Sequence, residues 1–409
     1  MDVLFIHGNY PAQFRYLCAA FSNNIQNQVV FLTACRNTQQ FPICGVKTIH
    51  YNIHRGIHPE THHYLHSTEE AVLRGQAVLR SVDVLLQQGF QPQLVIFHAG
   101  MGFGLFLRDI LPRAILIGYF EWWFRPETTQ HLVADFNFDI RLKTNLRNLP
   151  TLQELSICDA AVVPTDWQKQ QFPDIFQHKL EVIFDGIDTK FFYPAPNNFR
   201  SRVLRINNRV SGEQLEFQPD ALILSYATRG MEPLRGFPEF MRSLPQVFEE
   251  LGDLQVVIAG VDRCAYSYPA PSSNGSWKNY LLQELKGKIP TKQVYFTGLL
   301  SYTDYRALLW RSNLHCYFTR PYVVSWSFFE AIYCKSCLLS NACTATEDIA
   351  LKESVLWTTI EDPSSIVRSI VQGVKAPNQL HATIKNSEIY ELSSCLDKWK
   401  SILDLLIHG

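Results

Sequence analysis

The stretch LSYATRGMEPLRGFPEF, residues 224–240, places an apolar run directly before two arginines, Arg229 and Arg235. The run Leu222–Tyr226 is apolar almost throughout, which is typical of a parallel strand covered on both faces. The glycines and prolines that follow suit a turn and then the first turn of a helix. The stretch therefore predicts a strand, a turn and a helix, with two guanidiniums at the carboxyl end of the strand, where open α/β sheets bind ligands.

The same alternation of apolar runs and helical patterns recurs along the chain. Further strands are expected at Val3–Ile6, Val29–Leu32, Leu94–Phe97, Ile115–Tyr119, Gln255–Ala259, Val294–Thr297, His315–Phe318, Cys337–Ser340 and Val355–Thr358. Helices are expected at Ala12–Ser22, Glu69–Gln87, Phe237–Leu251, Trp277–Lys286, Tyr302–Arg311, Phe328–Tyr333 and Glu388–Ile407. This order predicts an α/β fold of two Rossmann-like, doubly wound domains, at 1–195 and 196–385. Residues 199–219 are polar and irregular, which predicts an insertion or a flexible loop.

Composition excludes some classes of function. The chain has 409 residues and a net charge of −1, from 37 basic and 38 acidic residues. This balance argues against binding nucleic acid or a membrane surface by bulk charge, although a small anionic ligand needs only two or three cations. The start lacks the basic segment of a signal peptide, and no apolar run is long enough to span a membrane. Ten cysteines without framework spacing predict reduced, mostly buried thiols in a cytoplasmic protein, and the single C-x-x-C of Cys334 and Cys337 makes a poor zinc site.

Two features of the second half predict binding of a phosphorylated ligand. Arg229 and Arg235 could neutralise a diphosphate, because guanidiniums stay charged at any relevant pH; two solvated arginines on a turn are the alternative. In SWSFFEA, residues 325–331, Ser325, Trp326 and Ser327 precede a helix that carries Glu330. Free amides at a helix start bind anions, but either serine could be a plain cap, and Glu330 could bind sugar hydroxyls or favour the helix dipole.

Several motifs together resemble family 4 glycosyltransferases, which are retaining enzymes of the GT-B fold. In the second half and the approach to it these are VPTDWQKQQFP (163–173), VIFDGIDTKFFYP (182–194), RGMEPLRGF (229–237) and SWSFFEA. MDVLFIHGNYPAQFRYL (1–17), HAGMGFGLFLRD (98–109) and IGYFEWWF (117–124) resemble the amino-terminal domain of one bacterial subgroup. The resemblance implies that a helix at 386–409 returns to the first domain.

The resemblance assigns donor-side roles in the second half. It implies that Arg229 and Arg235 bind the diphosphate of a nucleotide sugar and stabilise the leaving group without a metal. Glu330 would hold the ribose, at the second position of the family's E-x7-E pattern. The first position falls on Tyr322, a departure that puts the identity of the donor sugar in doubt. The other expected donor-side positions are Gly8 of the first domain and Gly260, Leu299, Val324, Ser325, Trp326 and Ser327 of the second.

The first half offers candidates for binding the acceptor. His98 ends a predicted strand, and Tyr119, Glu121 and Trp122 follow another. A carboxylate among aromatic rings suits proton exchange with a hydroxyl, so Glu121 is a candidate catalytic residue. The alternatives are a histidine bonded to a carbonyl, and an aromatic wedge in which Glu121 pairs with Arg125. The string G-x-G-x-G after His98 lacks the spacing of a dinucleotide fingerprint.

The function that we predict is transfer of a sugar from a nucleotide diphosphate sugar, with UDP favoured over GDP, to a hydroxyl acceptor. The acceptor is expected to be a bacterial natural product, a lipid or an envelope glycan. No cofactor, no metal and no nucleic acid are expected; peripheral membrane contact and the oligomeric state stay open. The alternatives are a non-catalytic nucleotide-sugar binder, a glycoside phosphorylase or a synthase on the same fold, and a two-domain sugar receptor.

Overall fold

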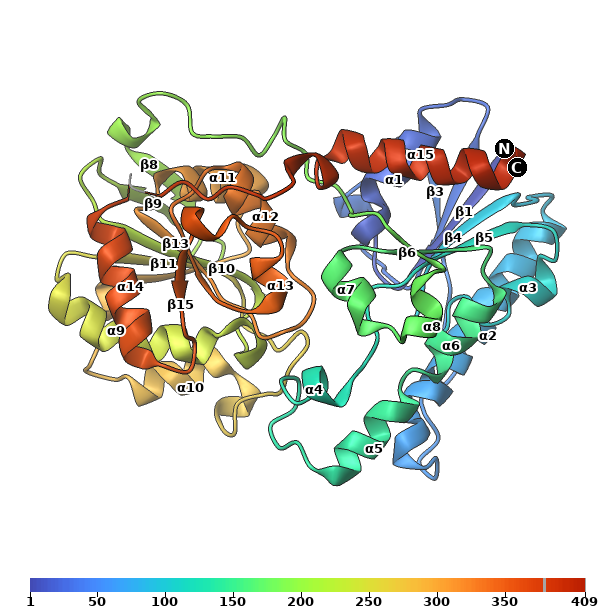
Figure 1. Cartoon of the computed structure of the whole chain (residues 1–409), viewed down its shortest axis with the longest axis horizontal. Helices are drawn as coiled ribbons and strands as arrows, with labels where there is room; N and C mark the ends of the chain where they lie inside the picture. The colour runs from blue at the N-terminus through green and yellow to red at the C-terminus, as the bar shows by residue number, and fades with distance from the viewer. Residues whose placement is uncertain (378–379, 409) are drawn as a thin grey trace. The chain divides into compact units, whose positions relative to one another are not determined.

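The computed structural model describes residues 1–377 and 380–408, which divide into two compact units (Figure 1). The first unit consists of Met1–Thr129, Phe136–Gly186 and the segment that begins at Glu388. The second consists of Gln130–Asp135 and Ile187–Ser387. Each unit is built on its own parallel sheet with helices, so the predicted fold class is confirmed.

The first unit has a sheet of seven parallel strands in the order β3-β2-β1-β4-β5-β6-β7. The strands are β1 (Asp2–His7), β2 (Gln28–Thr33), β3 (Val46–His50), β4 (Leu94–His98), β5 (Ile115–Tyr119), β6 (Ala160–Val163) and β7 (Leu180–Val182). Its helices are α1 (Arg15–Ser22), α2 (His66–Gln87), α3 (Leu107–Ile110), α4 (Pro126–Thr129), α5 (Phe138–Leu146), α6 (Leu149–Ile157), α7 (Asp166–Gln171), α8 (Asp174–Gln177) and α15 (Leu392–His408). The central strands are buried along their whole length, which explains why they read as continuous apolar runs.

The second unit has a sheet of six parallel strands in the order β12-β11-β10-β13-β14-β15. The strands are β10 (Ile223–Gly230), β11 (Gln255–Val261), β12 (Val294–Gly298), β13 (Leu314–Tyr317), β14 (Leu338–Asn341) and β15 (Leu356–Thr358). Its helices are α9 (Phe237–Glu250), α10 (Trp277–Glu284), α11 (Tyr302–Arg311), α12 (Trp326–Tyr333), α13 (Thr344–Glu347) and α14 (Pro363–Lys375), and the short 3-10 helix η5 (Pro233–Arg235) precedes α9. Every strand predicted in this half is confirmed to within a few residues.

Of the two alternatives expected at 199–219, an insertion or a flexible loop, the flexible loop is wrong. This segment contains an antiparallel hairpin of β8 (Leu204–Asn207) and β9 (Gln214–Phe217). Leu204, Ile206 and Phe217 are buried in a small core with Val257 and Leu308 of the second unit. Alternate residues of β8 are buried and exposed, so the hairpin has the ordinary two-residue period of a half-buried strand.

The two units divide at Gly186–Ile187, whereas the predicted boundary falls after residue 195. Phe191 and Tyr193 belong to the second unit because their rings pack on Arg306 of α11, with the guanidinium carbon 4.1 and 5.1 Å from the ring centres. Helix α15 lies in the first unit, beside α1 (Figure 1). A Cβ at Gly186 would lie only 2.9 Å from the Cα of Leu392, so the chain before the boundary touches the start of this helix.

Candidate functional site

The carboxyl end of β10 lies at the point of the second sheet where the strand order reverses, between β11 and β13. Ligands of open α/β sheets bind at such points. Arg235 follows β10 in η5 and is only 6% exposed. Its Nη1 donates to Thr319 Oγ1 at 2.7 Å and to Tyr317 Oη at 3.3 Å, next to the end of β13. Burial works against the charge of this guanidinium, but Tyr317 and the other groups around it hold its pKa above the ordinary value.

The hydrogen bonds of the Arg235 guanidinium go to neutral hydroxyls, and within the described residues it forms no ion pair. A buried cation is costly unless an opposite charge comes close. The Glu232 carboxylate helps to raise the pKa of Arg235, but its Oε2 bonds the loop at 265–267 and it forms no ion pair with the guanidinium. The site therefore suits an anionic group that bonds the guanidinium directly.

Tyr266 brings the two predicted arginines together. The guanidinium carbons of Arg229 and Arg235 lie 5.9 and 5.8 Å from the centre of its ring, and Arg229 Nη1 donates to its hydroxyl at 3.0 Å. Arg229 is exposed, so its charge is available at the surface beside the buried one. Tyr322, which stands where the family has its first glutamate, packs on the same ring at 5.7 Å.

Glu232 holds Tyr266 in this position. Its carboxyl is buried, and Oε2 accepts hydrogen bonds from the backbone amides of Ala265, Tyr266 and Ser267 at 2.8–3.0 Å. The Ser267 hydroxyl adds a fourth bond at 3.0 Å. Three consecutive amides around one carboxylate oxygen fix the loop after β11 to the turn after β10. Glu232 is therefore a positioning residue of the arginine site.

The start of α12 shares a pocket with Arg235. This pocket is lined by Tyr226, Ala227, Thr228, Arg235, Tyr317, Phe318, Ser325 and Ser327. The Ser325 amide donates to Tyr317 Oη at 2.9 Å, and the Ser325 side chain caps the helix by accepting from the Ser327 amide at 3.4 Å. The structure thus places the cap that the sequence left as an alternative, and it also brings the helix start and a buried cation to one place.

Glu330 lies one turn further along α12 and is buried. Burial raises the pKa of its carboxyl to about 8. The group is therefore mostly protonated near neutral pH and can donate a hydrogen bond as well as accept one, which is compatible with binding sugar hydroxyls.

The remaining donor-side candidates occupy different settings. Gly260 at the end of β11 has a φ of +136°, and a Cβ there would lie 2.0 Å from the carbonyl oxygen of Thr228. This glycine is thus required by the close approach of two strands, whatever its role toward a ligand. Leu299, after β12, is 67% exposed, Val324 is buried, and Trp326 is half-buried at the first position of α12.

In the first unit, two histidines meet at the point where the sheet reverses. His7 ends β1 and His98 ends β4, and because these strands are neighbours the two rings lie 4.5 Å apart. His98 Nε2 is 3.5 Å from Glu121 Oε2, and Glu121 Oε1 accepts a hydrogen bond from Gln13 at 3.0 Å. The sequence alternative in which Glu121 pairs with Arg125 is wrong, since Arg125 donates to backbone carbonyls at 170–172.

The other acceptor-side candidates are less available. Tyr119 is buried, and its hydroxyl donates to the Asp185 carboxylate, while burial raises its pKa well above the ordinary value. Trp122 is buried, with its ring centre 6.5 Å from that of Trp167. Gly8 follows His7, and a Cβ there would lie 3.1 Å from the ring of Phe103. The structure therefore brings His98 and Glu121 together but places Tyr119 and Trp122 in the packing around them.

The glycine string after His98 is explained by Glu154 of α6. This carboxyl is fully buried; Oε1 accepts the Gly104 amide at 2.7 Å, and Oε2 accepts the Gly100 amide. Burial raises the pKa of Glu154 to about 7, although the glycine amides oppose the shift. The loop that follows His98 is thus shaped around a side chain of the protein itself.

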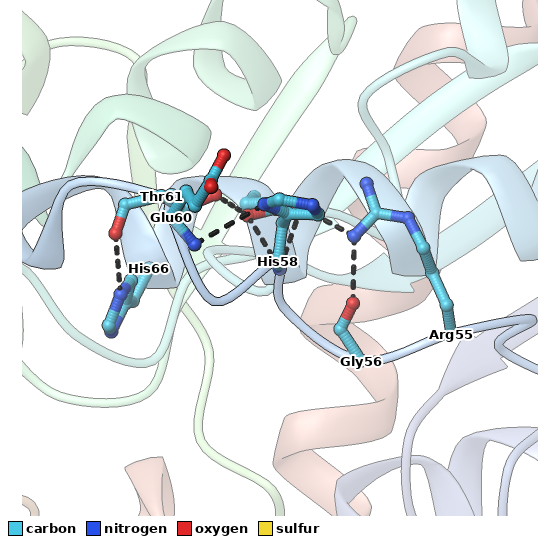
Figure 2. A network of polar contacts seen from close by, with 7 residues as sticks. Arg55, Gly56, His58, Glu60, Thr61 and His66 are labelled. Atoms are coloured by element: carbon cyan, nitrogen blue, oxygen red, sulfur yellow. Dashed lines mark hydrogen bonds and ion pairs between the residues drawn. The ribbon is translucent and has the colours of Figure 1, made fainter.

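A polar network closes the histidine-rich loop between β3 and α2 (Figure 2). Glu69 is its centre, accepting from Arg55 Nη1 at 2.5 Å, from the His58 amide at 3.2 Å and from the Thr61 hydroxyl. The bonds from Thr61 and Arg55 lower the pKa of Glu69 to about 2. His66 contacts the Thr61 carbonyl at 3.0 Å, so these side chains serve to fold the loop.

Over residues 1–377 and 380–408, no group of three or more His, Cys, Asp and Glu side chains is placed to hold a metal ion. In the same residues no helix combines the length and the apolar character needed to cross a bilayer. Cys334 and Cys337 are free and buried, as predicted.

Comparison with known families finds one match, in the first half of the chain. Residues 25–192 match the family described as "Glycosyl transferase family 4 group". This part of the chain is therefore similar to family 4 glycosyltransferases. Solved structures of similar architecture place the chain in the GT-B fold. No curated protein matches it significantly.

Three solved structures resemble the chain over nearly its whole length. Sucrose-phosphate synthase from Thermosynechococcus elongatus has a TM-score of 0.66 and 14% identity, with 100% of each chain covered. HepE from Anabaena, in complex with UDP and glucose, has a TM-score of 0.63 and 12% identity, with 99% of this chain and 100% of that chain covered. A putative UDP-N-acetylglucosamine 2-epimerase from Listeria monocytogenes matches at 0.55 and 13% identity, with coverages of 100% and 96%. Identities this low establish the fold but not the reaction.

Sequence reasoning missed three residues of the site: His7 beside His98 and Glu121, and Glu232 and Tyr266 beside the two arginines. The position predicted after β1 was Gly8, although His7 ends β1 as His98 ends β4. Glu232 lies inside the quoted stretch, between the two arginines, but nothing local shows which amides it binds. Tyr266 lies in the loop after β11, which carries no pattern that links it to Arg229.

Proposed function

We propose that the protein is a retaining, metal-independent glycosyltransferase that uses a nucleotide diphosphate sugar, with UDP as the nucleotide. One observation carries the proposal: a buried guanidinium, Arg235, bonds only neutral hydroxyls among the described residues and shares the ring of Tyr266 with the exposed Arg229. Two fixed cations beside a helix start suit a diphosphate better than a single phosphate.

The proposed role of the arginines is to stabilise the leaving group. As the bond between the sugar C1 and the diphosphate oxygen breaks, its electron pair passes to the diphosphate and the negative charge grows there. Arg235 is already buried and held by Thr319 and Tyr317, so it need not reorganise during the reaction. A preorganised cation of this kind can replace a metal ion in this role.

The acceptor hydroxyl forms the new bond to C1 on the face that the nucleoside diphosphate leaves, which retains the configuration. Its proton passes to a base. In the first unit we assign the acceptor side to His98 and Glu121, whose 3.5 Å contact at the end of the sheet offers one donor and one acceptor to a hydroxyl. The buried Tyr119 hydroxyl is engaged by Asp185, so we assign it a supporting role. A natural product, a lipid and an envelope glycan all supply such a hydroxyl.

Mutation of the arginines tests the proposal. The turnover of UDP-sugars, as transfer or as slow hydrolysis, is measured for the wild type, Arg235→Ala, Arg235→Lys and the control Arg368→Ala, an exposed arginine of α14. We expect Arg235→Ala to lower kcat/KM by about 100-fold or more, the usual effect of removing a preorganised transition-state donor. Arg368→Ala should change little. Equal activity of Arg235→Ala and wild type would contradict the proposed role.

A further inference from the structure

We propose that Gln13 is a positioning residue of the acceptor side, which holds the Glu121 carboxylate in place as the group that takes the proton of the acceptor hydroxyl. The inference rests on the proposed function, and it narrows the acceptor side of that proposal from two side chains to one. His98 then acts through Glu121 and does not touch the acceptor itself.

Exposure separates the two candidates for the base. The Glu121 side chain is 28% exposed, whereas that of His98 is 8% exposed. His98 Nε2 faces Glu121 Oε2 at 3.5 Å, and His98 Nδ1 is buried with no hydrogen-bond partner among the described residues. The carboxylate is therefore the member of the pair that an acceptor hydroxyl can reach.

Gln13 contacts the other oxygen of this carboxylate. It lies in the short 3-10 helix η1 (Ala12–Phe14), and its Nε2 donates to Glu121 Oε1 at 3.0 Å. The two oxygens thus face side chains from two different elements, η1 and β4. A carboxylate has acceptor positions for about four hydrogen bonds, so these two contacts orient the group without saturating it. A glutamine amide does not titrate, so its contact is the same at every pH.

The turn that carries Gln13 is itself fixed. Phe14 is buried, and its ring centre lies 5.8 Å from those of His7 and Tyr119, which end β1 and β5. Ala12 has a φ of +47°, in the left-handed region that residues other than glycine seldom adopt. Such a conformation persists only where the surrounding structure imposes it, and it is common at functional sites. Gln13 is therefore presented by a rigid turn.

The main chain at Glu121 is held independently of its side chain. Gln168 of α7 is buried, and its Nε2 donates to the Glu121 carbonyl at 2.7 Å, while its Oε1 accepts from Thr165 Oγ1 at 2.9 Å. Asn148 is also buried; it accepts from the Phe124 amide at 2.9 Å and donates to the Phe124 carbonyl at 2.8 Å. These bonds fix where the carboxylate begins, and the two side chains at its oxygens fix its direction.

The proposed role follows the proton of the acceptor. Its O–H bond breaks, the electron pair stays on the oxygen that bonds to the sugar C1, and the proton moves to the Glu121 carboxylate. The bond from C1 to the diphosphate breaks, and its electron pair leaves with the diphosphate. A base acts only within hydrogen-bond reach of the proton, so a displaced carboxylate lowers the rate. Gln13 should thus affect kcat and leave nucleotide binding unchanged.

The test is a double-mutant cycle on kcat for hydrolysis of a UDP-sugar, in which water is the acceptor. UDP-glucose, UDP-galactose and UDP-N-acetylglucosamine are offered, and the one that wild type turns over fastest is used. The variants are Gln13→Met, which keeps the size of the side chain but not its donor, Glu121→Gln, and the two together. Gln87→Met is the matched control, because Gln87 donates to the Asp83 carboxylate at 3.0 Å on the exposed face of α2.

The expected pattern is a loss that does not multiply. We expect Glu121→Gln to lower kcat by about 100-fold or more, as for removal of a general base, and Gln13→Met to lower it by about 10-fold. In the Glu121→Gln background Gln13→Met should change kcat by less than about 2-fold, because a residue that acts through a partner has no effect once the partner is gone. Gln87→Met should match wild type, and calorimetry should find UDP affinity unchanged in every variant.

Contrary outcomes separate the inference from the proposed function. An equal loss of kcat from Gln13→Met in both backgrounds would show a merely structural role and overturn the inference, as would wild-type kcat in either single variant or weakened UDP binding by Gln13→Met. If Gln13→Met does not fold, Gln13→Asn, which keeps the amide but shortens its reach, replaces it in the cycle. If wild type turns over none of the three UDP-sugars, or if Arg235→Ala is as active as wild type, the proposed function itself fails.

Discussion

Glu154 predicts a dependence of stability on pH that a single substitution should remove. The carboxyl is fully buried beneath the glycine loop after β4, and burial raises its pKa from 4.5 to about 7. Between these two values the folded protein keeps a proton that the unfolded chain has released. The stabilisation that this proton provides is complete below pH 4.5 and is lost as the pH rises to about 7.

The magnitude follows from the two pKa values. Within this window the free energy of unfolding falls by about 1.4 kcal/mol per pH unit. The window runs from pH 4.5 to about pH 7, so pH 5.5 lies inside it and pH 8 lies above it. The free energy of unfolding of the wild type should therefore fall by about 2 kcal/mol between pH 5.5 and pH 8. Glu154→Gln does not titrate, so its stability relative to wild type should rise by this amount on going from pH 5.5 to pH 8. At about 2–4 °C per kcal/mol for a domain of about 200 residues, the difference in Tm should shift by about 4–8 °C.

Differential scanning fluorimetry of both proteins at the two pH values measures this shift. At pH 5.5 the variant should be the less stable protein, because the glutamine NH2 faces a glycine amide that loses its acceptor, at a cost of about 1–3 kcal/mol. Glu181→Gln, at an exposed position of β7, is the matched control and should show no pH-dependent difference. A constant difference in Tm between wild type and Glu154→Gln at both pH values would refute the reasoning.

Three further predictions concern single residues. Gly260→Ala should destabilise the protein by at least about 3 kcal/mol, because the new Cβ would lie 2.0 Å from the Thr228 carbonyl oxygen. The measurement is a lower Tm or loss of folded protein, and a Tm equal to wild type would show that the strands can separate there. Glu232→Ala should weaken UDP binding by about 10-fold, because the loop at 265–267 loses the carboxylate that holds it. Calorimetry measures the affinity, and an unchanged value would show that the loop keeps its place without the carboxylate. Mass spectrometry after brief thiol labelling at pH 8 should find Cys44 modified first, because it is exposed, and Cys316 among the last, because it is fully buried and burial raises its pKa well above the ordinary value. Labelling of Cys316 before Cys44 would contradict the burial described.

Apolar patterning predicted most of the fold because the central strands are buried on both faces. The strands at the sheet edges behave differently. β3, Val46–His50, is only partly buried, and β7, Leu180–Val182, has three residues, so neither gives a continuous apolar run and neither was predicted. The β8–β9 hairpin was missed for a related reason: half of its residues face outward and are polar, and the two-residue alternation in Leu204–Asn207 is the only signal that it offers.

The part of the candidate site whose residues all follow one strand could be predicted from the sequence. Arg229 and Arg235 follow a single strand, so the sequence alone places them together. Glu232 and Tyr266 belong to the same cluster through hydrogen bonds between two loops, and no local pattern encodes such a contact. Tyr119 ends its strand as expected, but its hydroxyl donates to Asp185, a partner distant in sequence that no local pattern indicates.

The most direct test of the central claim is a crystal structure of the protein with UDP bound. The account predicts the diphosphate at the end of β10, with its oxygens about 2.7–2.9 Å from the guanidinium nitrogens of Arg235 and within reach of Arg229. A diphosphate bound away from both arginines, with Arg235 still bonded only to Tyr317 and Thr319, would contradict it.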